Sequence, residues 1–264
     1  MSKVTSADGT SIAYERSGEG PAVIVVGGAF NDKATAAPLA EQLAPRFTVV
    51  RYDRRGRGDS GDTLPHDVAR EVEDLGSLVR EIGGKPALFG MSSGAALAVR
   101  AVAAGVPASR LALYEAPFAP DDDATREHVQ QKAEALRALL REGRNGDAVI
   151  QFMREMGMPP EMADGMRHAP AFPALEAMAP TLAYDSEVMG DSTGGAIPAD
   201  LVASVKIPTL VAHGGAGSEQ MADISRQLSA LLPNGSLVTL PGQTHDVAAD
   251  AIAPVLAEFF NADT

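Results

Sequence analysis

A Gly-Met-Ser-Ser-Gly sequence at residues 90–94 is the first candidate for chemistry, because it fits the pattern Gly-x-Ser-x-Gly with Ser92 at its centre. The pattern alone has little specificity in a chain with 26 glycines, so its surroundings decide. It lies between apolar runs at 87–89 and 95–104, which predict a strand and a buried helix. A serine on such a sharp strand-to-helix turn exposes its hydroxyl above the sheet. We therefore interpret Ser92 as a nucleophile rather than as part of a merely tight turn.

An attacking serine needs a base, and the chain has five histidines. His245 lies in a loop between the last predicted strand (236–240) and the last predicted helix (247–260). From there it can reach the sheet edge that carries Ser92, so we favour it as the base. Of the other four, one is expected to be structural, two to be solvated and one to lie in a helical insertion: His213, His66 and His128, and His168.

Six short apolar runs predict the strands that position these residues, and most of the segments between them have helical periodicity. Strands this apolar are buried on both faces, as in a mostly parallel sheet covered by helices on both sides. An α/β fold is therefore expected. The predicted strands are 22–26, 47–52, 87–89, 111–114, 208–212 and 236–240.

The region from residue 117 to about residue 200 breaks this alternation. It has no good strand, several helical stretches separated by Pro and Gly, and seven of the ten methionines. We expect residues 117–200 to form a helical insertion, called the cap below, in a core made of residues 1–116 and 201–264. Ligands of such sheets bind at the edge that the cap would cover. The methionines are expected mainly to fill the cap's own interior, and together they favour an adaptable apolar pocket.

Over essentially its whole length the chain resembles the α/β-hydrolase family, in the branch that uses a serine nucleophile. The Gly-Gly-Ala-Phe sequence at 27–30 stands where that family has its oxyanion segment, although Gly27 replaces the usual histidine. Residues 52–60 resemble its Asp-x-Arg-Gly-x-Gly-x-Ser turn. The resemblance implies an α/β-hydrolase fold and an oxyanion hole made by the backbone N–H groups of Ala29 and Ser93, in which neither side chain takes part.

The third member of the triad is where the chain departs from the family pattern. Most members carry an Asp a few residues after the strand predicted here at 208–212, but this chain has Gly217 there, and Glu219 comes about two residues late. Some members, zearalenone-type lactonases among them, also have a Ser-Ser-Gly elbow and place the acid where Glu115 stands. We favour Glu115 over Glu219 as the acid. A Ser–His dyad, Asp246 or a cap residue remain as alternatives, and Glu115 could instead form a structural ion pair.

Composition excludes several other classes of protein. The absence of cysteine rules out disulfides, thiolate metal sites and a cysteine nucleophile. With 22 Lys and Arg against 35 Asp and Glu, the net charge of −13 argues against a nucleic-acid or anionic-membrane surface. The N-terminal region has no apolar stretch of signal or membrane-spanning length, so a cytoplasmic location is expected. Residues 56–61 fit Gly-x-Gly-x-x-Gly but open a polar stretch, so no dinucleotide cofactor is expected, and no residue spacing suggests a metal.

These observations predict a serine hydrolase that cleaves a small apolar carboxylic ester or lactone through an acyl-enzyme on Ser92, with His245 as base and Glu115 orienting it. The same residues could act on another bond, in C–C cleavage or perhydrolysis. A non-catalytic ligand-binding member of the fold is the third alternative, which the absence of an acid at Gly217 favours and the intact Ser92 and His245 oppose. The sequence does not indicate an oligomeric state.

Overall fold

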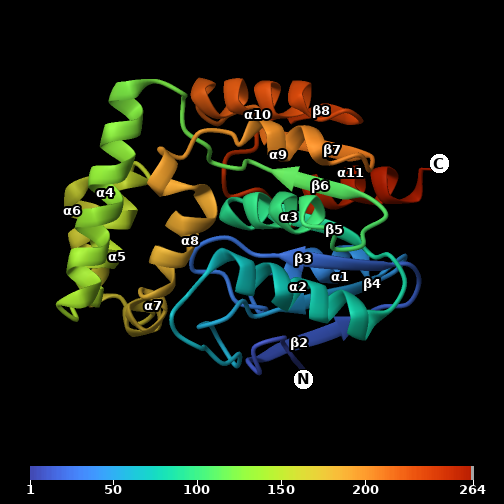
Figure 1. Ribbon diagram of the computed structural model, residues 1–264, viewed down its shortest axis with the longest axis horizontal. Helices are drawn as coiled ribbons and strands as arrows, with labels where there is room; N and C mark the ends of the chain where they lie inside the picture. The colour runs from blue at the N-terminus through green and yellow to red at the C-terminus, as the bar shows by residue number, and fades with distance from the viewer. Residues whose placement is uncertain (263–264) are drawn as a thin grey trace.

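The computed structural model describes residues 1–262, and these contain an eight-stranded sheet in the order β1-β2-β4-β3-β5-β6-β7-β8 (Figure 1). β1 and β2 are antiparallel to their neighbours, and the remaining pairs are parallel. The strands are β1 (Ser2–Thr5), β2 (Ser11–Ser17), β3 (Ala22–Val26), β4 (Thr48–Tyr52), β5 (Ala87–Met91), β6 (Leu111–Tyr114), β7 (Thr209–Gly214) and β8 (Gly235–Leu240).

Helices cover both faces of the sheet, which confirms the expected α/β-hydrolase fold. One face packs against α2 (Val68–Ile82), α3 (Ser93–Ala103), α9 (Ala199–Ser204) and α10 (Glu219–Leu231). The other packs against α1 (Ala37–Leu43) and α11 (Ala249–Asn261). The two faces hold separate apolar clusters because successive side chains along a strand point to opposite sides.

Strand register brings the expected site residues to one edge. Val26 of β3 pairs with Gly90 of β5, and Met91 of β5 pairs with Tyr114 of β6. Tyr114 in turn pairs with Ala212 of β7. Because these strands are parallel, the residues that follow β3, β5 and β6 all emerge at the same carboxyl edge of the sheet.

Between β6 and β7 the chain forms a group of helices that lies beyond this edge (Figure 1). α8 lies between the rest of this group and α3, and it packs against α2, α3 and α4. The division of the chain into a core and a cap at residues 117 and 200 stays a prediction. The elements of this region are α4 (Asp123–Arg141), α5 (Asn145–Glu155), α6 (Pro160–Gly165), α7 (Phe172–Met178), α8 (Thr181–Met189) and the 3-10 helices η1 (Met166–His168) and η2 (Asp191–Thr193).

The structure differs from the sequence expectation at both edges of the sheet. The hairpin β1–β2 was not expected, because β1 is short and mostly exposed and so lacks the apolar run that marks an inner strand. β8 was expected to be buried on both faces, but it is the edge strand and most of its residues are exposed. No helix among residues 1–262 combines the length and the apolar character needed to cross a membrane.

Candidate active site

Ser92 occupies a sharp turn between β5 and α3. Its backbone has φ 56° and ψ −130°, a conformation that costs a non-glycine residue about 1–3 kcal/mol. The Ser92 N–H donates to the Tyr114 carbonyl (2.9 Å), which ties the turn to β6. Glycines let the strand and helix approach: a Cβ on Gly90 would lie 2.6 Å from the Ala95 Cα, and one on Gly94 would overlap the Val26 carbonyl oxygen. This is the geometry of a nucleophile elbow.

The loop between β8 and α11 carries His245 to the same edge. Its Nδ1 lies 2.8 Å from Oε2 of Glu115, which follows β6 directly. The Tyr114 hydroxyl donates to the Thr244 carbonyl, and the Ala216 N–H donates to the Gln243 carbonyl (2.8 Å). These bonds anchor the loop at the two residues that precede the histidine. Tyr114 was not singled out from the sequence, since an aromatic residue ending an apolar strand looks like core.

Glu115 is 2% exposed, and both of its carboxylate oxygens accept a hydrogen bond. Oε2 faces His245, and Oε1 accepts from the Gly214 N–H at the end of β7 (2.8 Å). Burial by itself would raise the pKa of Glu115, but the hydrogen bonds from His245 and Gly214 outweigh it, and the net shift is downward. An ionised carboxylate only accepts hydrogen bonds, so Nδ1 of His245 carries the proton and Nε2 is left free to take one.

The position expected of the family's usual acid lies against the same carboxylate. A Cβ on Gly217 would be 3.4 Å from Oε1 of Glu115, so a side chain there would enter the space next to this oxygen. Glu219 begins α10 and is exposed. Within residues 1–262 it makes no hydrogen bond to His245. Asp246 is also exposed.

The segment after β3 lies directly against the elbow. A Cβ on Gly28 would be 2.8 Å from the Ser92 Cβ. The Gly28 N–H donates to Asn31 Oδ1 (3.0 Å), and the Asn31 N–H donates to the Gly28 carbonyl (3.2 Å). Over the described range, the N–H groups of Ala29 and Ser93 donate no hydrogen bond. They are therefore available to an oxyanion.

An apolar cavity of about 280 Å³ adjoins these segments on the face covered by α1 and α11. Each of three site segments contributes a lining residue: Gly27 from the segment after β3, Met91 immediately before Ser92, and Val247 two residues after His245. Such a cavity suits a small apolar group.

The cap also touches this region. The Phe30 ring packs edge-on against Phe152 of α5, with 5.4 Å between ring centroids. Ala29 and Phe30 pack against the apolar cluster inside the cap, as do three of its methionines: Met153, Met158 and Met166. Two others, Met156 and Met162, are exposed. The methionines therefore do not form one continuous pocket lining.

One histidine was misjudged from the sequence. His66 was expected to be solvated, but its side chain is 4% exposed and its ring stacks on Tyr184 of α8, with 3.8 Å between ring centroids. Nδ1 lies 2.7 Å from Glu187 and Nε2 lies 3.2 Å from Glu71. Burial lowers the pKa of His66, but the two carboxylates outweigh burial and raise it. Glu71 lies five positions from His66, but Glu187 lies 121 positions away on α8, so no local pattern could reveal this second carboxylate.

The other histidines agree with expectation. His213 is buried, and its Nε2 lies 2.9 Å from the Thr239 hydroxyl oxygen. His128 and His168 are exposed. Among the described residues no group of three or more His, Asp or Glu side chains could hold a metal ion.

Comparison with known proteins places this geometry in a family. The model of the alpha/beta hydrolase family matches residues 22–258. The crystal structure of an alpha/beta hydrolase from Sphaerobacter thermophilus DSM 20745 is 51% identical, with a TM-score of 0.87, over 98% of this chain and 100% of that one. The 2-(acetamidomethylene)succinate hydrolase of Mesorhizobium japonicum is 25% identical over 93% of this chain and 90% of its own. An uncharacterized hydrolase of Bacillus subtilis, YraK, is 37% identical over only 34% of each chain. The chain is a hydrolase and belongs to the alpha/beta hydrolase family.

Proposed function

We propose that this hydrolase cleaves a small apolar carboxylic ester or lactone through an acyl-enzyme on Ser92. The observation that carries the proposal is the 2.8 Å contact between His245 and the buried carboxylate of Glu115, at the sheet edge where the elbow presents Ser92. A histidine held this way can act as a general base and then as a general acid.

The reaction begins when Ser92 Oγ attacks the carbonyl carbon and Nε2 of His245 takes the hydroxyl proton. Negative charge develops on the carbonyl oxygen, and the free N–H groups of Ala29 and Ser93 stabilise it. His245 returns the proton to the leaving alkoxide, and an alcohol departs, or remains tethered as a hydroxyl if the substrate is a lactone. Water, deprotonated by His245, then attacks the acyl-enzyme and releases the carboxylic acid and Ser92.

The histidine must reach the serine for this sequence to run. Within the part of the chain that the structure describes, no hydrogen bond joins Ser92 Oγ to His245. Catalytic hydrogen bonds are commonly long in unliganded hydrolases and tighten in the substrate complex. Glu115 holds His245 through Nδ1, so Nε2 is the nitrogen that takes the serine proton.

The cavity beside Gly27, Met91 and Val247 supports an apolar substrate group.

The non-catalytic alternative loses its main support. It depended on the missing acid at Gly217, and the carboxylate of Glu115 lies next to that position.

Covalent labelling with a fluorophosphonate tests the nucleophile. Wild type should gain one label on Ser92, Ser92→Ala none, and Ser109→Ala, a control at an exposed loop serine, should label like wild type. The proposal fails if wild type stays unlabelled or if Ser92→Ala labels equally.

A panel of nitrophenyl esters and lactones tests which type of bond the enzyme cleaves. Labelling of Ser92 without turnover of any of them would reject the ester or lactone and favour C–C cleavage or perhydrolysis.

A further inference from the structure

A carboxylate from the cap is hydrogen-bonded to the side chain of Ser93, one of the two proposed oxyanion donors. Asp185 on α8 is 5% exposed. Its Oδ1 accepts a hydrogen bond from the Ser93 hydroxyl (2.7 Å) and another from Arg54 Nη1 (2.7 Å). Arg57 Nη2 donates to both Oδ1 and Oδ2 (2.8 Å each). Asp185 is thus joined to three core residues that lie 92, 131 and 128 positions away in sequence.

The two arginines continue from Asp185 to the segment after β3. Arg54 Nη1 donates to the Gly27 carbonyl (3.2 Å), and Arg57 Nη1 donates to the Gly28 carbonyl. The Gly28 carbonyl belongs to the same peptide group as the Ala29 N–H. In a trans peptide these two groups point in opposite directions in one plane, so holding the carbonyl also sets the direction of the N–H. A cation on the carbonyl also polarises the amide and strengthens its N–H as a donor.

The second proposed donor is tied to the same carboxylate. Among the described residues the backbone N–H of Ser93 donates no hydrogen bond, while its side-chain hydroxyl donates to Asp185. The Ser93 side chain, which the sequence left without a role, therefore links the start of α3 to α8. Both oxyanion donors depend on Asp185, one through Arg57 and the other through a hydroxyl.

The charges in this buried group balance only when Asp185 is present. Arg54 has a second partner, since Glu71 accepts from its Nε and Nη2 (2.7 and 2.8 Å). Among the described residues Arg57 pairs with no carboxylate other than Asp185. All four side chains are at least 94% buried. Loss of the Asp185 charge would leave the Arg57 guanidinium uncompensated in a site of low dielectric, which is strongly unfavourable.

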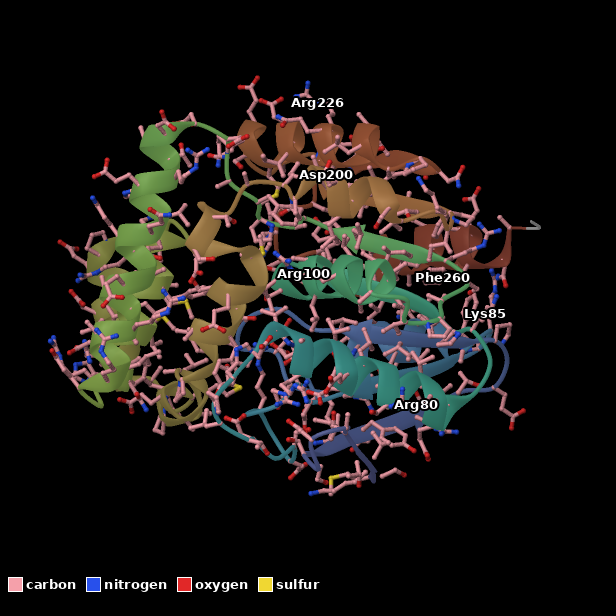
Figure 2. All side chains as sticks on the ribbon, in the orientation of Figure 1. Arg80, Lys85, Arg100, Asp200, Arg226 and Phe260 are labelled. Carbon is pink, nitrogen blue, oxygen red and sulfur yellow. The ribbon has the colours of Figure 1, made fainter. Side chains whose placement is uncertain are left out.

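α8 is itself held by several contacts with the core. Arg100 of α3, labelled in Figure 2, donates from Nε to the Val188 carbonyl (2.7 Å). Tyr184 stacks on His66, and its hydroxyl donates to Asp62 (2.7 Å). Figure 1 shows α8 between the outer cap helices and the carboxyl edge of the sheet. The seating of α8 on the core therefore fixes where the Asp185 carboxylate lies.

We infer that Asp185 is a positioning residue that couples the seating of the cap to the geometry of the oxyanion hole. When α8 is seated, Asp185 holds Arg57 on the Gly28 carbonyl and Ser93 at the start of α3, and both N–H groups point at the reacting carbonyl oxygen. When α8 shifts, Asp185 loses its hydrogen bonds to Arg57 and to the Ser93 hydroxyl at the same time. This inference rests on the proposed function, because it takes Ala29 and Ser93 as the oxyanion donors.

Asp185→Asn tests the coupling, with Asp191→Asn as a matched control. Asp191 is also a buried cap aspartate (3% exposed) that accepts from an arginine, Arg137, and from a serine hydroxyl, Ser186 (2.6 Å), but it does not contact the oxyanion segment. We expect Asp185→Asn to lower kcat about 10- to 100-fold with little change in KM, since oxyanion contacts are made mainly in the transition state. Asp191→Asn should keep kcat within about threefold of wild type.

A transition-state analogue separates positioning from mere stability. Ser92 Oγ adds to the carbonyl of an aryl trifluoromethyl ketone, His245 takes the serine proton, and the resulting hemiketal oxyanion occupies the hole. Its affinity should fall by the same factor as kcat/KM in Asp185→Asn, while the affinity of the carboxylate product changes little. If Asp185→Asn does not fold, Ser93→Ala removes one neutral donor to the same carboxylate and should lower kcat and ketone affinity together, by about tenfold.

The outcomes are distinguishable from failure of the proposed function. Wild type that does not label at Ser92 overturns that function. Wild type that labels, combined with wild-type kcat and ketone affinity in Asp185→Asn, or in Ser93→Ala if the former does not fold, overturns only the coupling. An equal loss in Asp191→Asn would also overturn it, because the effect would then reflect the stability of the cap.

Discussion

Replacement of Glu115 by glutamine tests the assignment of the acid most directly, because the side chain keeps its shape and loses its charge. The Glu115 carboxylate spans two donors at 2.8 Å, Nδ1 of His245 and the Gly214 N–H. A glutamine amide has one oxygen and one NH2 group, so it can satisfy only one of these donors. If the amide oxygen stays on Gly214, the NH2 group faces Nδ1 and stabilises the tautomer of His245 that carries its proton on Nε2. If the amide group flips, the buried Gly214 N–H is left without an acceptor.

The size of the effect on kcat follows from the lost carboxylate charge and from the lost hydrogen bond. When His245 takes the serine proton, its positive charge lies about 4 Å from the carboxylate charge, which is worth about 4 kcal/mol at an effective dielectric constant near 20. The His245 side chain is 37% exposed, so solvent screening reduces this to about 3 kcal/mol. The wrong tautomer or the orphaned N–H costs about 2 kcal/mol more. A total of about 5 kcal/mol corresponds to a loss of about 10³- to 10⁴-fold in kcat.

The assay is kcat on the nitrophenyl ester that wild type cleaves fastest, with thermal unfolding to show that the fold is retained. Glu219→Gln is the control and should stay within about twofold of wild type, since Glu219 is exposed at the start of α10. A Glu115→Gln enzyme of full activity would refute the assignment. So would a comparable loss in Glu219→Gln.

Three further predictions follow from the same geometry. Gly217→Asp, added to Glu115→Gln, should recover at least about tenfold of the lost kcat, because a Cβ at 217 lies 3.4 Å from the Glu115 carboxylate; no recovery would show that position 217 cannot reach His245. Gly94→Ala should lower the free energy of unfolding by about 3 kcal/mol and the Tm by roughly 10 °C, since the methyl group would overlap a backbone carbonyl of β3. Calorimetry measures this change, and an unchanged Tm would contradict the close contact between α3 and β3. The pKa of His66 is raised in the folded protein above its ordinary value of 6.5, so its two carboxylate contacts stabilise the fold most below about pH 6.5 and lose this effect as pH rises through the folded pKa. The Tm advantage of wild type over His66→Gln should therefore shrink between about pH 6 and 9, and a constant difference would contradict the ion pairing.

Local sequence determined the parts of the site that depend on short segments. An apolar strand, two glycines and an apolar helix within residues 87–104 specify the elbow around Ser92, because the close approach of strand and helix excludes side chains at Gly90 and Gly94. The central strands were likewise predictable, since buried parallel strands have continuous apolar runs. The β1–β2 hairpin and the exposed β8 were not, because edge strands depend on pairing rather than on burial.

Tertiary structure decided which charged groups meet. The sequence offered Glu115 and Glu219 as acids, and the pairing of β6 with β7 brings Glu115 to His245 while Glu219 begins α10 at the surface. It gave no sign that Asp185 would bind Ser93, because the two are 92 residues apart and a single aspartate in a cap helix has no periodic signal. The physical reason is general: apolar periodicity acts through burial and is visible in a short window, whereas a buried ion pair needs both partners placed by the whole fold.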